Sequence, residues 1–145
     1  MRLKKFRKCS GRRKIAPMCL GIKPAKLGTF PDLRSGNFLD LLLWLLRRRR
    51  RFRVEGDSMQ PILQPGDEVL VNPRAYEKSH PAPEDLIICE HPHRPQLQLL
   101  KRAIVIDDSG NCFVLGDNDT ASTDSRSFGM VRSKAILGKV VCRFL

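Results

Sequence analysis

The pattern of apolar and polar positions divides the chain into three segments. Residues 1–36 are rich in Lys, Arg, Gly and Pro and have weak periodicity. Such a segment offers too little apolar surface to offset the conformational entropy lost on folding, so we expect it to be mobile. The stretch FLDLLLWLL at 38–46 predicts a short amphipathic helix, and six of the seven residues from 47 to 53 are basic. From residue 51 onward, short apolar stretches alternate with turn signals, as in β-sheet proteins.

Six stretches after the arginine run predict β-strands. In RFRVEG, Phe52 and Val54 fall on one face of the strand, as Val69 and Val71 do in EVLVN. The other four stretches are DLIICEH, QLQLLKRAIVI, CFVLG and ILGKVVCRF, and turns are marked by PGD at 65–67 and DSGN at 108–111. The sequence therefore predicts a basic arm over residues 1–50 and a compact all-β domain over residues 51–145.

The net charge of +12 resides in the arm. Residues 1–53 contain 17 basic and 2 acidic side chains, whereas residues 54–145 contain 10 basic and 13 acidic ones. A nucleic-acid-binding domain carries its basic stripe on the folded surface. Because the predicted domain is slightly acidic, we expect no specific nucleic-acid partner.

The spacing of cysteine and histidine argues against disulfide and metal sites. Five cysteines with wide gaps and no C-x-x-C pair make a poor disulfide framework and a poor zinc site. We expect them to be reduced, with Cys89, Cys112 and Cys142 acting as small apolar residues in strands. His91 and His93 flank a proline in a predicted loop and are a weak candidate for a metal chelate. We therefore expect no metal and no cofactor.

Two interpretations of the segment 38–46 stay open. Its nine residues include Asp40, whereas a membrane span takes about 20 apolar residues. The arginines directly after it do not resemble the small-residue cleavage site of a secretory signal. One interpretation is an interfacial helix, with its Leu and Trp side chains among lipid headgroups and residues 38–53 in peripheral contact with an anionic membrane. The other is a helix that packs on its own domain or on a partner protein.

Three polar stretches interrupt the predicted strands: GDSMQP at 56–61, LKR at 100–102 and GDNDTASTDSR at 116–126. Each alone has an ordinary explanation as a turn, a solvated lysine or a polar loop. In this order they closely resemble the type I signal peptidase family (peptidase S26) of serine proteases, which use a Ser–Lys dyad. The resemblance covers about residues 52–144 and implies the signal-peptidase β fold, which is related to that of LexA-type repressors.

By motif position, the resemblance assigns roles to five residues. Ser58 matches the nucleophile, Lys101 the general base, and Ser122 the serine whose hydroxyl orients the lysine. Asp124 and Arg126 match an ion pair that holds the last loop. A lysine is a base only when neutral, so its pKa must fall from about 10.4 towards roughly 7–8 through desolvation. The apolar residues on both sides of Lys101 make such a setting available.

The residues next to the nucleophile are candidates for the substrate pocket or the oxyanion hole: Gly56, Asp57 and Met59. Gly56, two positions before the nucleophile, has no side-chain hydroxyl that assists an oxyanion hole. Backbone N–H groups at Ser58 would then carry more of that stabilisation.

Further residues resemble a narrower family, the nickel-type superoxide dismutase maturation proteases. They are FRVEGDSM, NPRAY at 72–76, HPHRP at 91–95, and STDSRSFG followed by a terminal G-x-V-x-C-R-F strand. This resemblance implies a bacterial protease that needs no metal and removes an N-terminal extension from the nickel superoxide dismutase precursor, exposing its metal-binding N-terminus. The chain lacks the N-terminal membrane spans of many bacterial family members. We therefore expect a cytoplasmic protein, peripheral at a membrane if residues 38–46 bind lipid.

Three other functions are alternatives to this one. A general type I signal (leader) peptidase of exported proteins would share every assigned residue. A self-cleaving regulator of the LexA type shares the dyad, but residues 1–50 lack the two periodic helices of a helix-turn-helix. A non-catalytic protein that binds polyanions through its arm would leave the ordered motifs unexplained.

Overall fold

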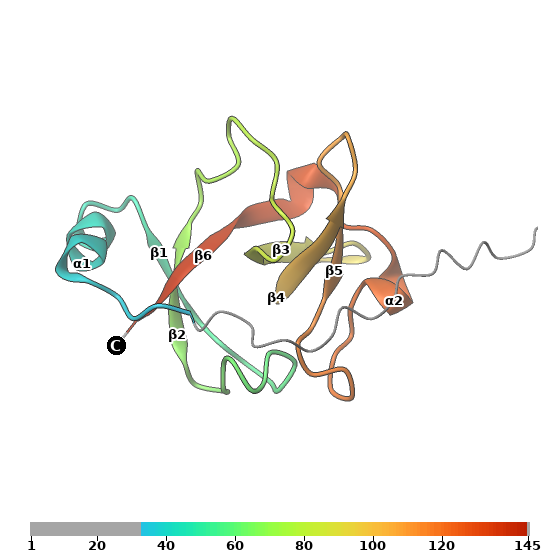
Figure 1. Cartoon of the computed structure of the whole chain (residues 1–145), viewed down its shortest axis with the longest axis horizontal. Coiled ribbons are helices and arrows are strands. Elements are labelled where there is room, and N and C mark those ends of the chain that lie inside the picture. Colours follow the sequence, from blue (N-terminus) through green and yellow to red (C-terminus); the bar gives the residue numbers. More distant parts are fainter. Residues whose placement is uncertain (1–32, 145) are drawn as a thin grey trace, which may run out of the picture. The chain divides into compact units, whose positions relative to one another are not determined.

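The structure, a computed structural model, describes residues 33–144 and contains one antiparallel sheet of six strands (Figure 1). The strands are β1 (Arg50–Arg53), β2 (Glu68–Asn72), β3 (Leu86–His91), β4 (Arg94–Ile106), β5 (Cys112–Leu115) and β6 (Ile136–Phe144). The helical elements are short: α1 (Phe38–Leu45), α2 (Ser125–Phe128) and a 3-10 turn at Ser133–Ala135. The predicted all-β class is confirmed, and each predicted strand is present.

The order of strands in the sheet places the C-terminal strand in its middle. The order is β1-β2-β6-β3-β4-β5, so β6 joins the N-terminal pair to the three strands that follow. The long strand β4 pairs with β3 over residues 94–102 and with β5 over residues 102–106. Within the described residues, the first part of β4 therefore has a strand neighbour on one side only. Lys101 and Arg102 lie where this one-sided stretch ends.

Buried side chains form two clusters on opposite faces of the strands. Successive residues of a strand point to opposite faces, and along β3 Leu86 and Ile88 enter one cluster while Ile87 and Cys89 enter the other. The cysteines expected to act as small apolar strand residues are free and buried: Cys89, Cys112 and Cys142. The sheet is therefore packed on both of its faces.

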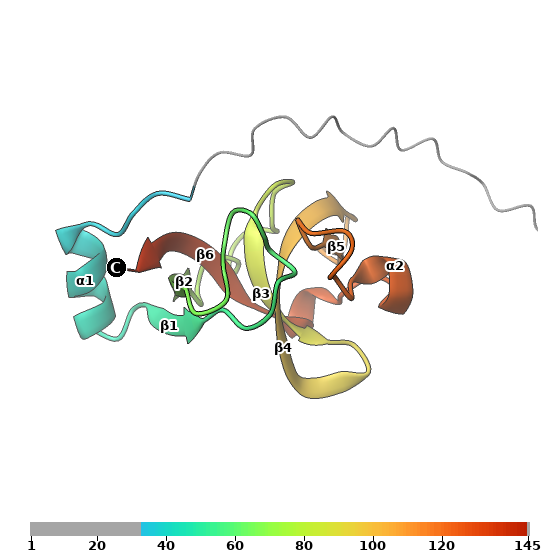
Figure 2. The same cartoon turned by 90° about the horizontal axis from the view of Figure 1, so that it is seen from below.

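Residues 33–50, which the sequence pattern places in the arm, contact the sheet. Ser35 forms a parallel bridge with Arg143, and the rings of Trp44 and Phe144 lie 5.7 Å apart between centroids. In both views α1 lies beside the C-terminal end of β6 (Figures 1 and 2). These contacts lie before residue 51, where the sequence places the start of the domain, and the bounds of the domain stay a prediction. A single backbone bridge and an aromatic pair leave no periodic signal, so the pattern of residues does not reveal them.

The remaining part of the predicted arm, residues 1–32, lies outside the described residues, so its mobility stays a prediction. The helix expected at 38–46 is α1, which ends at Leu45. Between residues 33 and 144, no helix is long and apolar enough to cross a membrane.

A chain that begins at Arg51 is expected to be less stable than one that begins at Pro31. It lacks the Ser35 bridge and the Trp44–Phe144 contact, and an aromatic pair alone contributes about 0.5–1.5 kcal/mol beyond its buried area. Urea unfolding of both chains measures the difference as a lower midpoint for the shorter one. Equal midpoints would show that the domain begins at the boundary expected from the sequence.

Candidate active site

Ser58 lies in the loop between β1 and β2, and its neighbours anchor that loop. Met59 is 1% exposed and belongs to the same buried cluster as Val54 and Leu63. The carbonyl of Met59 also accepts a hydrogen bond of 3.0 Å from the backbone N–H of Leu63. Gly56 adopts φ = 76°, a left-handed conformation that favours glycine. The buried residues on both sides hold the turn and leave Ser58 half-buried.

Lys101 lies on β4 opposite Ile87 of β3, and only 3% of its surface is exposed. Burial disfavours the charged ammonium and lowers the pKa of Lys101, while the negative charge of Asp124 acts in the opposite direction. The Nζ atom donates a hydrogen bond of 3.1 Å to Ser122 Oγ. The lysine therefore lies in a desolvated setting, and its pKa is shifted in the direction that a general base requires.

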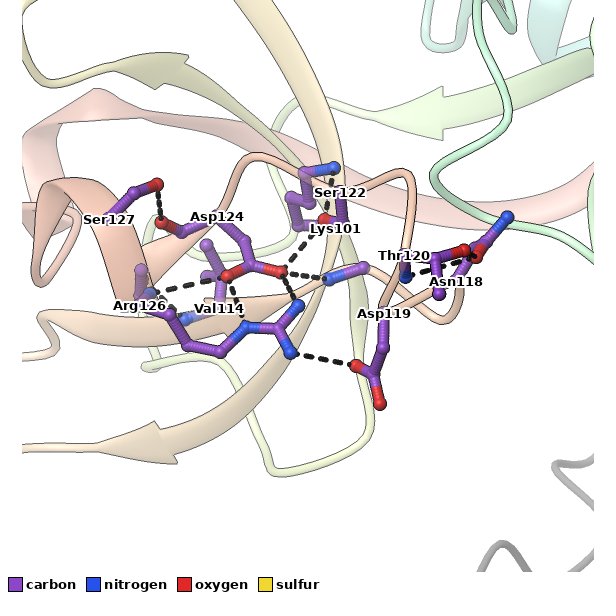
Figure 3. Close-up of polar contacts among 11 residues, drawn as sticks. Lys101, Val114, Asn118, Asp119, Thr120, Ser122, Asp124, Arg126 and Ser127 are labelled. Atoms are coloured by element: carbon purple, nitrogen blue, oxygen red, sulfur yellow. Dashed lines mark hydrogen bonds and ion pairs between the residues drawn. The ribbon is translucent and has the colours of Figure 1, made fainter.

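A chain of hydrogen bonds extends from Lys101 through Ser122 to Asp124 (Figure 3). The Ser122 hydroxyl accepts from Lys101 and donates to Asp124 Oδ2 at 2.8 Å. The Asp124 carboxylate also accepts from the Gly116 N–H at 3.1 Å and from the Arg126 guanidinium at 2.7 and 2.9 Å. Burial raises the pKa of Asp124, but the hydrogen bonds, foremost those from Arg126, lower it to about 2. The carboxylate is therefore ionised at neutral pH and fixes the Ser122 hydroxyl.

Ser58 and Lys101 line one cleft with a volume of about 370 Å³. One wall is the end of β1 with the loop that follows it, and the other is the one-sided stretch of β4. Apolar side chains from both walls, among them Phe52, Met59 and Leu99, line the cleft. The cleft therefore places the hydroxyl and the buried amine beside a partly apolar groove.

The loop after β5 contacts the Ser58 loop as well as Lys101. The backbone N–H of Asn118 donates to the carbonyl of Ser58 at 3.0 Å, and its side-chain amide donates to the carbonyl of Asp57 at 3.1 Å. A Cβ atom at Gly116 would lie 2.6 Å from the carbonyl oxygen of Ser58, so only glycine permits this approach. Asn118 and Gly116 thus join the two loops that carry Ser58 and Ser122.

An ion pair next to Lys101 received no role from the sequence. Arg102 donates to Asp117 through two hydrogen bonds of 2.8 and 2.9 Å, and both side chains are almost fully buried, at 4% and 3% exposure. The pair joins β4 to the loop after β5, which carries Ser122 and Asp124. Arg102 belongs to the LKR motif and Asp117 to the GDN motif, and the available signal was an arginine directly before the apolar run AIVI of the same strand.

The structure brings most of the predicted site residues together. Lys101, Ser122, Asp124 and Arg126 form one hydrogen-bonded group, and Ser58 shares the cleft with Lys101. Of the residues that flank Ser58, Met59 lines the cleft, whereas Gly56 and Asp57 are exposed and outside its lining. Asp57 instead accepts a hydrogen bond from the side chain of Gln60. Among residues 33–144, no group of three or more His, Cys, Asp or Glu side chains is arranged to hold a metal ion.

We expect Lys101 to lose its proton at a lower pH than an exposed lysine, whose pKa is about 10.4. Because burial lowers the folded-state pKa, the unfolded chain binds more protons between the two pKa values. The free energy of unfolding therefore rises with pH across that window. An NMR titration of lysine labelled at Cε measures the pKa, and Lys101→Met assigns the signal. A Lys101 signal with a midpoint near 10.4 would contradict the desolvated setting.

Comparisons with known proteins agree with this geometry. Residues 41–107 and 108–145 match the family model of signal peptidase, peptidase S26. Mitochondrial inner membrane protease subunit 2 of Mus musculus is 32% identical over 100 residues, which cover 54% of this chain and 57% of that protein. The same subunit of Danio rerio is 31% identical over 108 residues, covering 60% of this chain and 59% of the relative.

Signal peptidase I of Aquifex aeolicus (strain VF5) is 34% identical over 70 residues, which cover 46% of this chain and 27% of that protein. The chain thus spans under three-fifths of the length of each of these relatives. The resemblance drawn from the ordered motifs is confirmed at the level of the family, because the family model matches well over half of the chain. The protein belongs to the signal peptidase, peptidase S26 family of serine endopeptidases.

Proposed function

We propose that the protein is a serine endopeptidase in which Ser58 is the nucleophile and Lys101 is the general base. The proposal rests on one observation, the burial of Lys101 with its Nζ hydrogen-bonded to Ser122. A buried structural lysine needs a carboxylate to compensate its charge. The Nζ atom of Lys101 donates to the neutral Ser122 hydroxyl, and Asp124, whose charge acts on the lysine, forms its ion pair with Arg126. Such a lysine is adapted to lose its proton beside the Ser58 hydroxyl.

The reaction follows from these positions. Neutral Lys101 Nζ takes the proton of Ser58 Oγ as this oxygen attacks the scissile carbonyl, and the resulting ammonium gives the proton to the leaving amine. A water molecule activated by the same Nζ then hydrolyses the acyl-enzyme. Ser122 holds Nζ in place through its hydrogen bond. The backbone N–H of Ser58 is the candidate donor to the oxyanion, because Gly56 has no side-chain donor.

The substrate is a precursor protein, and the nickel superoxide dismutase precursor fits the sequence best. The relatives found by comparison are named for other proteases, so this substrate rests on the chain's own NPRAY, HPHRP and STDSRSFG stretches. Removal of the N-terminal extension frees the amine and the side chain that bind nickel in the mature dismutase. A soluble precursor of this kind places the reaction in the cytoplasm.

A general signal peptidase of exported proteins is the second candidate. The similarity to signal peptidase I of Aquifex aeolicus favours it, because the same cleft and the same dyad would serve a leader peptide. The two candidates differ in the precursor that they cut, and not in the residues that cut it. Only the choice of substrate separates them.

Incubation of the full chain with each type of precursor tests the proposal. The substrates are a nickel superoxide dismutase precursor and an exported protein with its leader, and mass spectrometry of the product identifies the new N-terminus. We expect cleavage of the dismutase precursor by the wild-type chain and none by Ser58→Ala. Cleavage of the leader alone would establish the second candidate. Cleavage that persists in Ser58→Ala would contradict the assigned nucleophile.

A further inference from the structure

Helix α1 exposes its apolar side chains and buries its charged one, which is the reverse of a helix on the surface of a soluble domain. Such a helix buries its apolar side chains and exposes its charged ones. In α1 the only charged residue, Asp40, is 3% exposed, whereas Phe38 and Leu45 are 81% and 71% exposed. Asp40 is held inward by an ion pair of 2.8 Å with Arg34 and by a hydrogen bond from the backbone N–H of Asn37. The packing of residues 33–40 thus turns the apolar side of α1 outward.

Within residues 33–144, the exposed large apolar side chains are concentrated on and directly after this helix. The structure exposes ten large hydrophobic residues within its described part, and seven of them lie between residues 38 and 46. These seven are Phe38, Leu39, Leu41, Leu42, Trp44, Leu45 and Leu46. Scattered single apolar residues are normal on a protein surface, but a contiguous apolar patch marks an interaction site.

Positive charge borders this apolar patch. Arg47, Arg48 and Arg50 directly follow α1 and are exposed, and no acidic residue occurs between Asp40 and Glu55 in the sequence. The guanidinium of Arg51 lies 6.0 Å from the centroid of the Trp44 ring, which joins the arginine run to the helix. The apolar patch and the basic run therefore form one continuous surface, which we call the docking surface (residues 38–53).

We propose that the docking surface binds the interface of an anionic lipid bilayer, with α1 lying in the membrane plane. The apolar side chains enter the boundary between headgroups and acyl chains, and the arginines contact lipid phosphates. A neutral apolar partner would cover α1 but would leave the row of exposed arginines without counter-charges. An anionic bilayer matches both halves of the surface at once. Because Phe52 and Arg53 line the cleft, docking also holds the cleft close to the lipid.

The fluorescence of Trp44 can be used to measure this interaction. Trp44 is its only tryptophan and is 36% exposed. Titration of the full chain with vesicles of phosphatidylglycerol and phosphatidylcholine is expected to shift the Trp44 emission to shorter wavelength. The shift should weaken with added salt and should be much smaller with pure phosphatidylcholine vesicles, because the arginine contribution depends on anionic lipid. No shift with anionic vesicles would overturn the proposal.

Two sets of substitutions separate the apolar and the electrostatic contributions. Leu39→Glu combined with Leu45→Glu is expected to abolish vesicle binding, whereas Met130→Glu, an equally drastic change at an exposed site outside the docking surface, leaves it intact. Replacement of Arg47, Arg48 and Arg50 by Gln is expected to weaken binding to anionic vesicles on the order of a hundredfold, since each arginine contributes roughly fivefold. Unchanged binding in either set would overturn the proposal.

The same substitutions identify other occupants of the surface. If α1 packs against a second copy, sedimentation of the wild-type chain shows a dimer that Leu39→Glu with Leu45→Glu dissociates, and vesicles do not bind. If another part of the chain covers it, the same variant lowers the free energy of unfolding and vesicles do not bind. Either outcome would refute lipid docking. Ser58→Ala is expected to bind vesicles as the wild type does, so docking is tested independently of the proposed proteolysis.

Discussion

Alanine at Ser58 or at Lys101 is expected to abolish cleavage of the precursor, with a loss of roughly 10³-fold or more in kcat/KM. Ser58→Ala removes the attacking oxygen, and Lys101→Ala removes the base without which that oxygen keeps its proton. Because the two side chains act as one unit, the double variant should be no slower than either single variant. Cleavage assays on the three variants, with N-terminal sequencing of the product, measure this.

Two lysine controls separate chemistry from folding. Lys101→Met keeps the length of the side chain but has no base, so it should be inactive and at least as stable as the wild type, because a buried amine is replaced by an apolar group. Lys134→Met changes an exposed lysine outside the cleft and should alter neither property. Near-full activity of Lys101→Met would rule out the lysine base.

The strands were predictable because each combines a local pattern with clear ends. Alternating apolar residues in EVLVN and the long apolar run to Ile106 match β2 and β4, and Gly and Pro mark the turns between strands. A period of two residues requires no knowledge of the rest of the fold. The order of strands was not predictable, because the insertion of β6 between β2 and β3 depends on contacts more than 40 residues apart in sequence.

Residues 33–50 show what local patterns miss. The sequence of α1 predicts an amphipathic helix, but its apolar residues do not indicate whether they face the sheet or solvent. Burial of Asp40 depends on Arg34 and on contacts around residue 143, none of which has a sequence signature. The boundary predicted at residues 50 and 51 follows the start of the strand pattern, and local patterns carry no signal for the contacts of residues 33–50.

The candidate site was predictable as a set of residues but not as a network. The resemblance to the signal peptidase family indicated five residues, because they stand at matching positions of its ordered motifs: Ser58, Lys101, Ser122, Asp124 and Arg126. The contacts of Asn118 with the Ser58 loop and the buried Arg102–Asp117 pair need three-dimensional proximity. These residues support the loops that hold the dyad, and their role follows from geometry and not from residue type.

The second large effect is expected from Asp124→Asn, which should lower stability and activity together. The Asp124 carboxylate accepts hydrogen bonds from Ser122, Gly116 and Arg126 with both oxygens. Asparagine replaces one of these acceptors by an NH₂ donor, so buried donors face each other. The loss in the free energy of unfolding is expected to be about 3 kcal/mol, the lower end for a broken buried pair because Arg126 is 44% exposed. Activity falls because Ser122 no longer positions Lys101.

Asp119→Asn is the matched control for Asp124→Asn, because Asp119 also pairs with Arg126, at 2.9 Å, but is 71% exposed. An exposed pair contributes about 0–1 kcal/mol, so this variant should unfold almost as the wild type does.

The pH dependence of stability gives a second test of Asp124. The lowered pKa of Asp124, about 2 against a usual 3.8, contributes stability that is present above pH 4 and is lost as the pH falls towards 2. The difference between the wild type and Asp124→Asn should therefore shrink over that range in urea unfolding. Loss of activity with an unchanged free energy of unfolding would instead assign Asp124 a direct part in the chemistry.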